Sequence, residues 1–309
     1  MTLHPCFVGC DVSKHHLDIF DPLSGEERRI ANTETAIGAW VSARKSDRLH
    51  ITFEATGRHD RRLRQALDKA GIGYARVNPQ RARQFGKALG YMAKTDRLDA
   101  KLLAAMGRMM KPAADEPADA EREELAQMHK RRDQLVAMRQ NEKLRLNEAT
   151  EWEGATLQRH IAWLDAEIAA VEEECRRYLR SKPCLARTDR LLRSIPGVGP
   201  VTSLTLIAMM PELGRCRPQT AAALAGLAPF NADSGKFQGQ RRIRGGRKRV
   251  RDALYMAAVT AARSSSRLKT FATSLRERGK PFKVATIALA RKILVIANAV
   301  IRDQKPYAP

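Results

Sequence analysis

The stretch FVGCDVSKHHLDIFDP, residues 7–22, alternates apolar and polar side chains on both sides of a short Ser-Lys-His turn. Alternation with a period of two is typical of β-strands, so we expect a β-hairpin here. Pro22 and Gly25 end the hairpin, and its first strand carries Asp11 between apolar neighbours.

Further strands and helices alternate after this hairpin. A helical pattern covers residues 35–45, and a short apolar strand over residues 50–53 ends in Glu54-Ala-Thr-Gly57. A helix over 61–70, a strand over 74–77 and a helix over 96–110 follow, and Thr95 can cap the last of these. The order predicts an α/β fold over residues 1–112, a sheet with helices packed on it.

Residues 113–185 have a different character. Pro112 to Pro117 form a linker, and a heptad seam then runs for three repeats. Its members are Leu157, Ile161, Leu164, Ile168, Val171, Cys175 and Tyr178. A weaker stripe precedes it over residues 121–147, and Gly154 lies between the two stripes. We therefore expect a coiled-coil arm, either an antiparallel helical hairpin or a helix that dimerises.

Residues 186–309 read as a mainly helical, basic domain. The whole chain has 56 Lys and Arg against 34 Asp and Glu, a net charge of +22, and residues 217–309 alone hold 20 basic and 4 acidic residues. A field of this sign attracts a polyanion, of which nucleic acid is the most abundant in a cytoplasm. A merely cationic soluble protein or a ribosome-associated protein has the same composition.

Composition also argues against several other classes. The apolar run from Val284 to Ile301 is broken by Arg291 and Lys292, so we expect no membrane span. The N-terminus shows no secretory signal, and we expect a cytoplasmic protein. The five cysteines are odd in number and scattered, which supports neither a disulfide framework nor a zinc site.

Four carboxylates occupy positions suited to metal binding. Asp11 and Glu54 lie in or at the end of predicted strands, and Asp96 and Asp99 are three apart on one helix face. Mg²⁺ takes oxygen ligands, and two such ions can stabilise the attacking and leaving oxygens at a phosphorus. Each acid alone reads most simply as a solvated side chain or a helix cap.

Six blocks of sequence resemble one family. GCDVSKHHLDIF (9–20), ITFEATG (51–57) and KTDRLDAKLLA (94–104) are similar to the DEDD transposases of insertion sequence family 110, relatives of the Piv site-specific DNA invertases. LLRSIPGVGPVTSLTLIA (191–208), AALAGLAPFNADSG (222–235) and RDALYMAAV (251–259) resemble that family's second region. The resemblance covers nearly the whole chain in the right order.

This resemblance implies an RNase H-like (RuvC-like) domain at the N-terminus and a transposase domain at the C-terminus. It implies that Asp11, Glu54, Asp96 and Asp99 hold Mg²⁺, at a two-metal site, and that Ser234 is the nucleophile on DNA. It further implies donor and target DNA, a structured bridge RNA and a homo-oligomer, a dimer or tetramer, as partners. From the residues alone, Asn231 to Gly235 is a turn.

A basic stretch follows Ser234. Residues 236–251 contain eight cations and no acid, and we expect them to bind nucleic-acid phosphates. They are Lys236, Arg241, Arg242, Arg244, Arg247, Lys248, Arg249 and Arg251. Upstream, Pro196, Gly197 and Gly199 form a turn between two helices that either packs tightly or approaches a phosphate.

Three rival interpretations stay open at this point. The chain could be a RuvC-like nuclease that uses metals and water, with Ser234 as a turn residue. It could be a nucleic-acid-binding protein whose acids are structural, or an inactive relic of a mobile element. Only the recombinase hypothesis requires a covalent bond between Ser234 and DNA.

Overall fold

The computed structural model describes residues 6–44, 49–57, 59–90, 96–230, 242–264 and 266–308, with the side chains of 96–98 left undescribed. The chain divides into two compact units, Met1–Asp119 and Ala120–Pro309. The predicted α/β character of the first and the mainly helical character of the second are confirmed. The finer division into 1–112, 113–185 and 186–309 stays a prediction.

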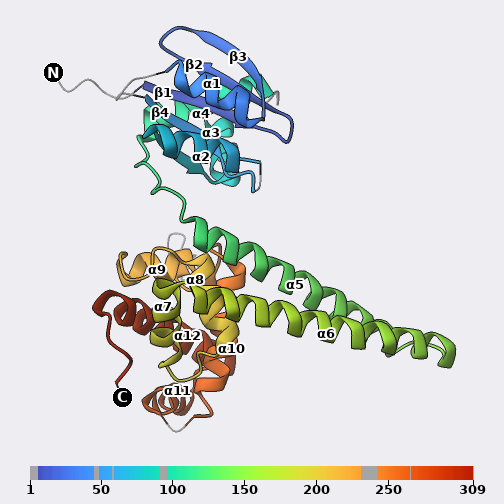
Figure 1. The fold of residues 1–309 in the computed structure, drawn as a ribbon. Helices are drawn as coiled ribbons and strands as arrows, with labels where there is room; N and C mark the ends of the chain where they lie inside the picture. The colour runs from blue at the N-terminus through green and yellow to red at the C-terminus, as the bar shows by residue number, and fades with distance from the viewer. Residues whose placement is uncertain are drawn as a thin grey trace. The chain divides into compact units, whose positions relative to one another are not determined.

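The first unit is built on a five-stranded mixed sheet (Figure 1). Its strands are β1 (Cys6–Val12), β2 (His16–Asp21), β3 (Glu26–Ala31), β4 (Leu49–Glu54) and β5 (Gly73–Val77). They lie in the order β3-β2-β1-β4-β5, with antiparallel pairs on the β3 side of β1 and parallel pairs on the β4 side. The parallel strands therefore end at one common edge of the sheet.

Helices cover both faces of this sheet. They are α1 (Glu34–Ser42), α2 (Arg61–Ala70), α3 (Pro79–Ala88) and α4 (Asp96–Met110). Val8, Cys10 and Val12 of β1 point to one face and join a buried core with apolar residues of α1 and α2. Because side chains alternate along a strand, Phe7, Gly9 and Asp11 point to the opposite face, where α4 packs.

Two elements of the first unit were absent from the sequence-based prediction. Strand β3 has the sequence EERRIA and is largely exposed, so it lacks the apolar alternation that identifies a strand. It is one of the two edge strands of the sheet, where charged side chains are tolerated and discourage pairing with other chains. Helix α3 begins at Pro79 with Asn78 as its cap, where the sequence had indicated only the end of a strand.

Helix α4 lies unusually close to the sheet. A methyl group built on Gly9 would lie 1.9 Å from the carbonyl oxygen of Ala100 and 2.5 Å from the nitrogen of Ala104. One built on Gly107 would lie 2.4 Å from Oγ1 of Thr52. Only glycine allows the helix and the sheet to lie this close together, so these two glycines determine the position of α4 on the sheet.

We predict that Gly9→Ala destabilises the first unit by several kcal/mol, because the methyl group meets rigid backbone rather than a movable side chain. Gly38→Ala is the matched control, since its methyl group meets nothing within 4 Å in α1. It should be neutral or stabilise by about 0.5–1 kcal/mol. Denaturant unfolding of both variants checks this, and equal stabilities would contradict the close packing of α4 on the sheet.

The second unit begins with a long helical hairpin (Figure 1). Helices α5 (Ala120–Leu146) and α6 (Glu151–Ser181) lie side by side, with Leu164 and Ile168 of the predicted seam buried against Leu135. The turn is at residues 147–150, where Thr150 forms a capping box with Glu153. Gly154, expected between the helices, instead lies inside α6.

A helical bundle completes the second unit. Its elements are α7 (Pro183–Arg193), α8 (Pro200–Met209), α9 (Pro218–Leu224), β6 (Pro229–Phe230), β7 (Arg242–Ile243), α10 (Lys248–Ala261), α11 (Arg267–Glu277) and α12 (Phe282–Asp303). One apolar core runs through its helices. Strands β6 and β7 pair antiparallel and are joined through residues 231–241, which lie outside the described part of the chain.

Helix α12 is the one helix among the described residues with the length and hydropathy of a membrane span. Half of its most apolar window is buried inside the unit, and Leu289, Ile293 and Ala297 are fully buried in the core. The core helix of a globular domain meets the same criteria, and the packing of α12 accounts for its apolar composition.

Candidate active site

A row of charged residues crosses the first unit at the carboxyl edge of its parallel strands. Arg29 pairs with Asp18 between β3 and β2, and Asp18 pairs with Asp11 between β2 and β1. The last paired residues of β1 and β4 are Cys10 and Phe53. Asp11 and Glu54 directly follow them, so these two acids lie next to each other on neighbouring strands. Two of the four predicted acids thus share one edge and one face.

Helix α4 brings its first turn to the same edge. Its Gly107 lies over Phe7, and Ala100 and Ala104 lie over Gly9, so the helix runs antiparallel to β1. The turn that precedes Ala100 therefore extends towards Asp11, and it contains Asp96 and Asp99. The side chain of Asp96 is outside the described part of the structure.

Asp18 and Arg29 are site residues that the sequence reasoning missed. Nε of Arg29 lies 2.9 Å from Oδ1 of Asp18, and Nη2 lies 2.9 Å from Oδ2, a bidentate ion pair. Asp18 is 5% exposed, so the guanidinium compensates a buried charge directly beside Asp11. The signal was available in the hairpin itself, because its short turn determines which residue lies opposite Asp11.

The donor set at this edge consists of carboxylate oxygens, the ligands that Mg²⁺ prefers. Asp11, Glu54 and Asp99 are each partly exposed, and each already takes part in a polar or electrostatic contact. Among the residues whose side chains are described, no group of three or more acids, histidines or cysteines is close enough to hold a metal ion. The fourth predicted ligand, Asp96, is not among those side chains.

Asn32 connects the two loops that follow the acid-bearing strands. Its side-chain amide donates to the carbonyl of Ser13 at 2.8 Å and to that of His59 at 3.0 Å. Its backbone N–H donates to His15, and its carbonyl accepts from Arg62. Asn32 is 4% exposed and directly follows β3. Its buried amide therefore sets the distance between the loop that follows Asp11 and the loop that follows Glu54.

We predict that Asn32→Asp lowers the free energy of unfolding of the first unit by about 2–3 kcal/mol, because a carboxylate cannot donate to two buried carbonyls. Asn141→Asp, exposed on α5, makes the same chemical change and should be near neutral. Hydrogen exchange should accelerate at residues 13–16 and 55–60 in the first variant alone. Unchanged exchange there would contradict the role of Asn32.

The other predicted site residues lie in the second unit. Ser234, Lys236 and Arg241 fall outside the described residues. Several cations of the basic stretch bind protein groups instead of facing solvent unpaired. Arg247 forms a bidentate pair with Glu212 at 2.7 and 2.5 Å, and Arg251 donates to the carbonyl of Gly245 at 2.7 Å.

Two more cations of this stretch form ion pairs, while a third lies over an aromatic ring. Lys248 pairs with Asp252 at 2.6 Å, and Arg249 pairs with Asp133 of α5. Arg244 lies 5.2 Å from the ring centroid of Phe230. The stretch therefore joins helices within the unit as well as contributing positive charge. Its role in nucleic-acid binding stays a prediction.

Arg249 lies next to a buried histidine. The hydroxyl of Thr205 donates to the carbonyl of Val201, so its oxygen accepts from Nε2 of His129 at 2.8 Å. Nδ1 of His129 is buried with no hydrogen-bond partner among the described residues. Burial, followed by the charges of Arg249 and Arg132, lowers the pKa of His129 to about 4. The imidazole is therefore neutral in the folded protein.

We predict that this histidine makes the second unit less stable in acid. His129 accepts a proton near pH 6.5 in the unfolded chain and only near pH 4 in the folded chain. The stability that comes from keeping His129 neutral is therefore fully present above pH 6.5 and is lost as the pH falls from 6.5 to 4. Between pH 7 and pH 4.5 the wild type should lose about 2 kcal/mol more than His129→Gln. Denaturant unfolding at the two pH values measures this, and parallel losses would contradict it.

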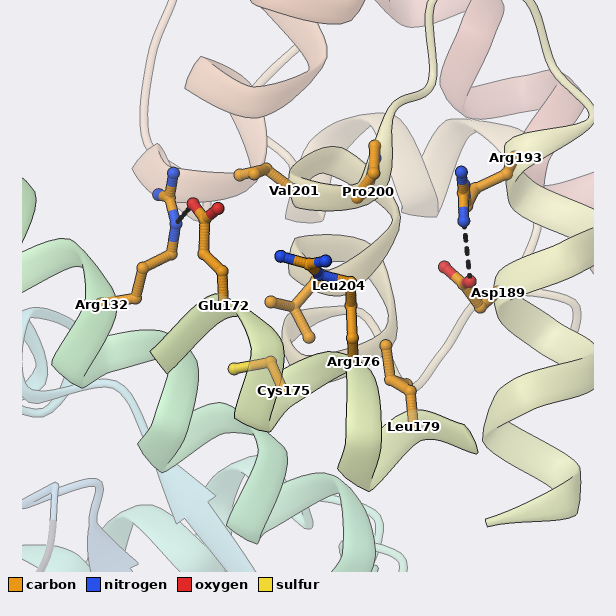
Figure 2. A pocket seen from close by; sticks show the side chains of 10 residues that line it. All are labelled: Arg132, Glu172, Cys175, Arg176, Leu179, Asp189, Arg193, Pro200, Val201 and Leu204. Atoms are coloured by element: carbon orange, nitrogen blue, oxygen red, sulfur yellow. Dashed lines mark hydrogen bonds and ion pairs between the residues drawn. The ribbon is translucent and has the colours of Figure 1, made fainter. Parts of the chain in front are cut away.

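The glycine turn before α8 serves packing. A methyl group on Gly197 would lie 2.3 Å from the carbonyl oxygen of Ala257 in α10, and the φ angle of Gly197 is 86°. Figure 2 shows the adjoining cavity of about 50 Å³, where Arg132 faces Glu172 and Arg193 faces Asp189. These arginines pair with acids within the unit.

Comparison with known proteins gives the family. A DEDD transposase model of the IS110 family matches residues 8–150, and a model described as the transposase IS116/IS110/IS902 family matches residues 189–273. The two matches follow each other along the chain and reach both compact units. The chain belongs to the IS110 family of transposases.

Individual relatives agree with this assignment. Pilin gene-inverting proteins of Moraxella lacunata and Moraxella bovis are each 26% identical to the chain over 312 residues, covering 97% of both sequences. A 42 kDa protein of insertion element IS900 from Mycobacterium paratuberculosis is 30% identical over 162 residues, half of this chain and 39% of that protein. As an IS110-family member, the chain is a DNA strand-transfer enzyme.

Proposed function

We propose that this IS110-family protein is an insertion-sequence transposase or site-specific recombinase that exchanges DNA strands through a covalent serine–DNA intermediate. The observation that carries the proposal is the convergence of Asp11, Glu54 and the first turn of α4 on one sheet edge. Acids on adjoining strand ends and one helix suit the binding of divalent metal ions, which can assist phosphoryl transfer. The family assignment supplies the DNA substrate.

We further propose that the first unit is an RNase H-like domain. Three antiparallel strands followed by two parallel ones, in the order β3-β2-β1-β4-β5, support this assignment. Asp11, Glu54, Asp96 and Asp99 would hold Mg²⁺, which supplies electrostatic stabilisation of the charge that develops at phosphorus. Asp18, already paired with Arg29, would remain a neighbour of these ligands.

In the proposed reaction, Oγ of Ser234 bonds to phosphorus and the bond from phosphorus to one sugar oxygen breaks. The serine proton is transferred to a base, and the departing sugar oxygen gains a proton to leave as a hydroxyl group. Attack by the hydroxyl of another DNA end reverses these steps and joins the exchanged strand. The number of phosphodiester bonds is conserved, so no external energy source is needed.

The acids and Ser234 belong to different units of the chain. We propose a composite site, completed when the two units meet within one protein or between two copies. A dimer or tetramer, with the α5–α6 hairpin as an interface, suits this arrangement. A bridge RNA that pairs with donor and target DNA would use the positive charge of residues 217–309, and we place the reaction in the cytoplasm.

We predict that wild-type protein incubated with Mg²⁺, candidate RNA and labelled DNA yields protein-linked label on a denaturing gel. Ser234→Ala should lower this yield by about three orders of magnitude or more, because no other group replaces the lost nucleophile. Ser181→Ala, exposed at the end of α6, is the matched control and should retain it. Asp11→Asn should also abolish linkage.

The same gel separates the rival functions. DNA cleavage that survives in Ser234→Ala but is lost in Asp11→Asn would replace the proposal with a metal-dependent nuclease. Binding of DNA or RNA without cleavage or linkage by the wild type would indicate a non-enzymatic binding protein or an inactive relic. Either result contradicts the serine mechanism.

A further inference from the structure

The second unit contains a large cavity that the proposed reaction does not use. Its volume is about 800 Å³, within the range of ligand pockets. It lies among β6, β7, α10, α11 and the first half of α12. Figure 1 labels these three helices. Strands β6 and β7 are also the two ends of the segment 231–241, which carries Ser234.

One face of α12 forms a wall of this cavity. Val284, Ile287, Ala288 and Arg291 line it and follow the i, i+3, i+4, i+7 spacing of a single helix face. The fully buried core residues of α12 form a different set, although Ile287 also packs against the edge of that core. Helix α12 is therefore apolar on two faces, and Val284 on the second one is 52% exposed. Packing within the described unit explains the first face and Ile287, but not the exposed Val284.

The cavity combines an apolar lining with cations. Leu227, Ile243 and Phe271 contribute to the lining, and none of its described lining residues is acidic. Arg242, Lys283 and Arg291 also line it, and the side chains of these three form no hydrogen bond or ion pair with another described residue. They differ in this from Arg247 and Arg249, which are paired.

We infer that this cavity binds an unpaired nucleotide of the nucleic acid on which the protein acts. A base offers a flat apolar ring for the lining, and its phosphates offer negative charge for the three cations. A base within a duplex is stacked and cannot enter, so the nucleotide must be single-stranded or extruded. An apolar peptide segment would leave three cations without partners.

This inference rests on the proposed function only in that the protein acts on nucleic acid. Strands β6 and β7 are the two ends of the segment that carries Ser234, so a nucleotide held here would be bound next to the ends of that segment. The site would act on DNA or RNA by the same chemistry. Separate DNA and RNA probes distinguish the two sources.

The test compares short single-stranded oligonucleotides with abasic oligomers of the same length and number of phosphates. Fluorescence anisotropy with the full-length protein, at one fixed salt concentration, gives the two affinities. The oligomer with bases should bind about tenfold more tightly or better, because stacking and burial of a base add to phosphate binding. Equal affinities for both oligomers, in DNA and in RNA, would overturn the inference.

Two variants locate the effect. Ala288→Trp fills the cavity, and Val284→Glu adds an acid at an exposed lining position that the fold does not need. Both should abolish the preference for bases, whereas Met256→Glu, at an apolar position of α10 that is 59% exposed and outside the lining, should keep it. If Val284→Glu retains the preference, the cavity is not the base site.

A protein partner is a separate outcome. If Val284→Glu and Ala288→Trp change the oligomeric state but not the preference for bases, the cavity is an interface between copies and the inference fails. Serine–DNA linkage is measured independently. Linkage that persists without any base preference removes the cavity proposal alone, and base preference without linkage removes the serine mechanism alone.

Discussion

The contact between the backbones of α4 and β1 is the constraint on which the candidate active site depends. Gly9 and Gly107 allow the helix to lie closer to the sheet than any side chain would permit. Because the helix is rigid and its direction is set by these two contacts, its first turn has one position relative to the strand ends. Asp99 thereby comes to the edge that holds Asp11 and Glu54, although more than forty residues of sequence separate each of these acids from the next.

Gathering carboxylates at one edge opposes folding, and the surrounding residues show how the first unit compensates. Arg29 neutralises Asp18, the acid that is most deeply buried in the cross-strand row. Asn32 supplies donors to the loops beyond the two strand ends, so their separation does not depend on the acids themselves. A divalent cation at the remaining carboxylates would complete the compensation, which is the physical reason for coupling between metal binding and stability at such a site.

Positive charge in the second unit has two structural roles. Arg247 binds Glu212 in the turn after α8, and Arg249 binds Asp133 of α5, so these pairs hold the start of the basic helix α10 against the bundle and the arm. Arg242, Lys283 and Arg291 have no such partners within the described residues and surround an apolar cavity. Net charge alone does not separate these groups, because a paired and an unpaired guanidinium contribute equally to it.

The sequence sufficed to predict the β1–β2 hairpin, helices α1, α2 and α4, the long arm helices and the family, because each depends on a local period or a short block of residues. It did not predict β3, whose edge position permits a polar pattern, or the turn at 147–150, where Thr150 rather than Gly154 ends the loop. Tertiary structure alone identified Asn32, the ion pair that Asp18 forms with Arg29 on the unpredicted strand β3, and the second apolar face of α12. Local patterns record whether an element is buried, whereas these features depend on which distant element packs against it.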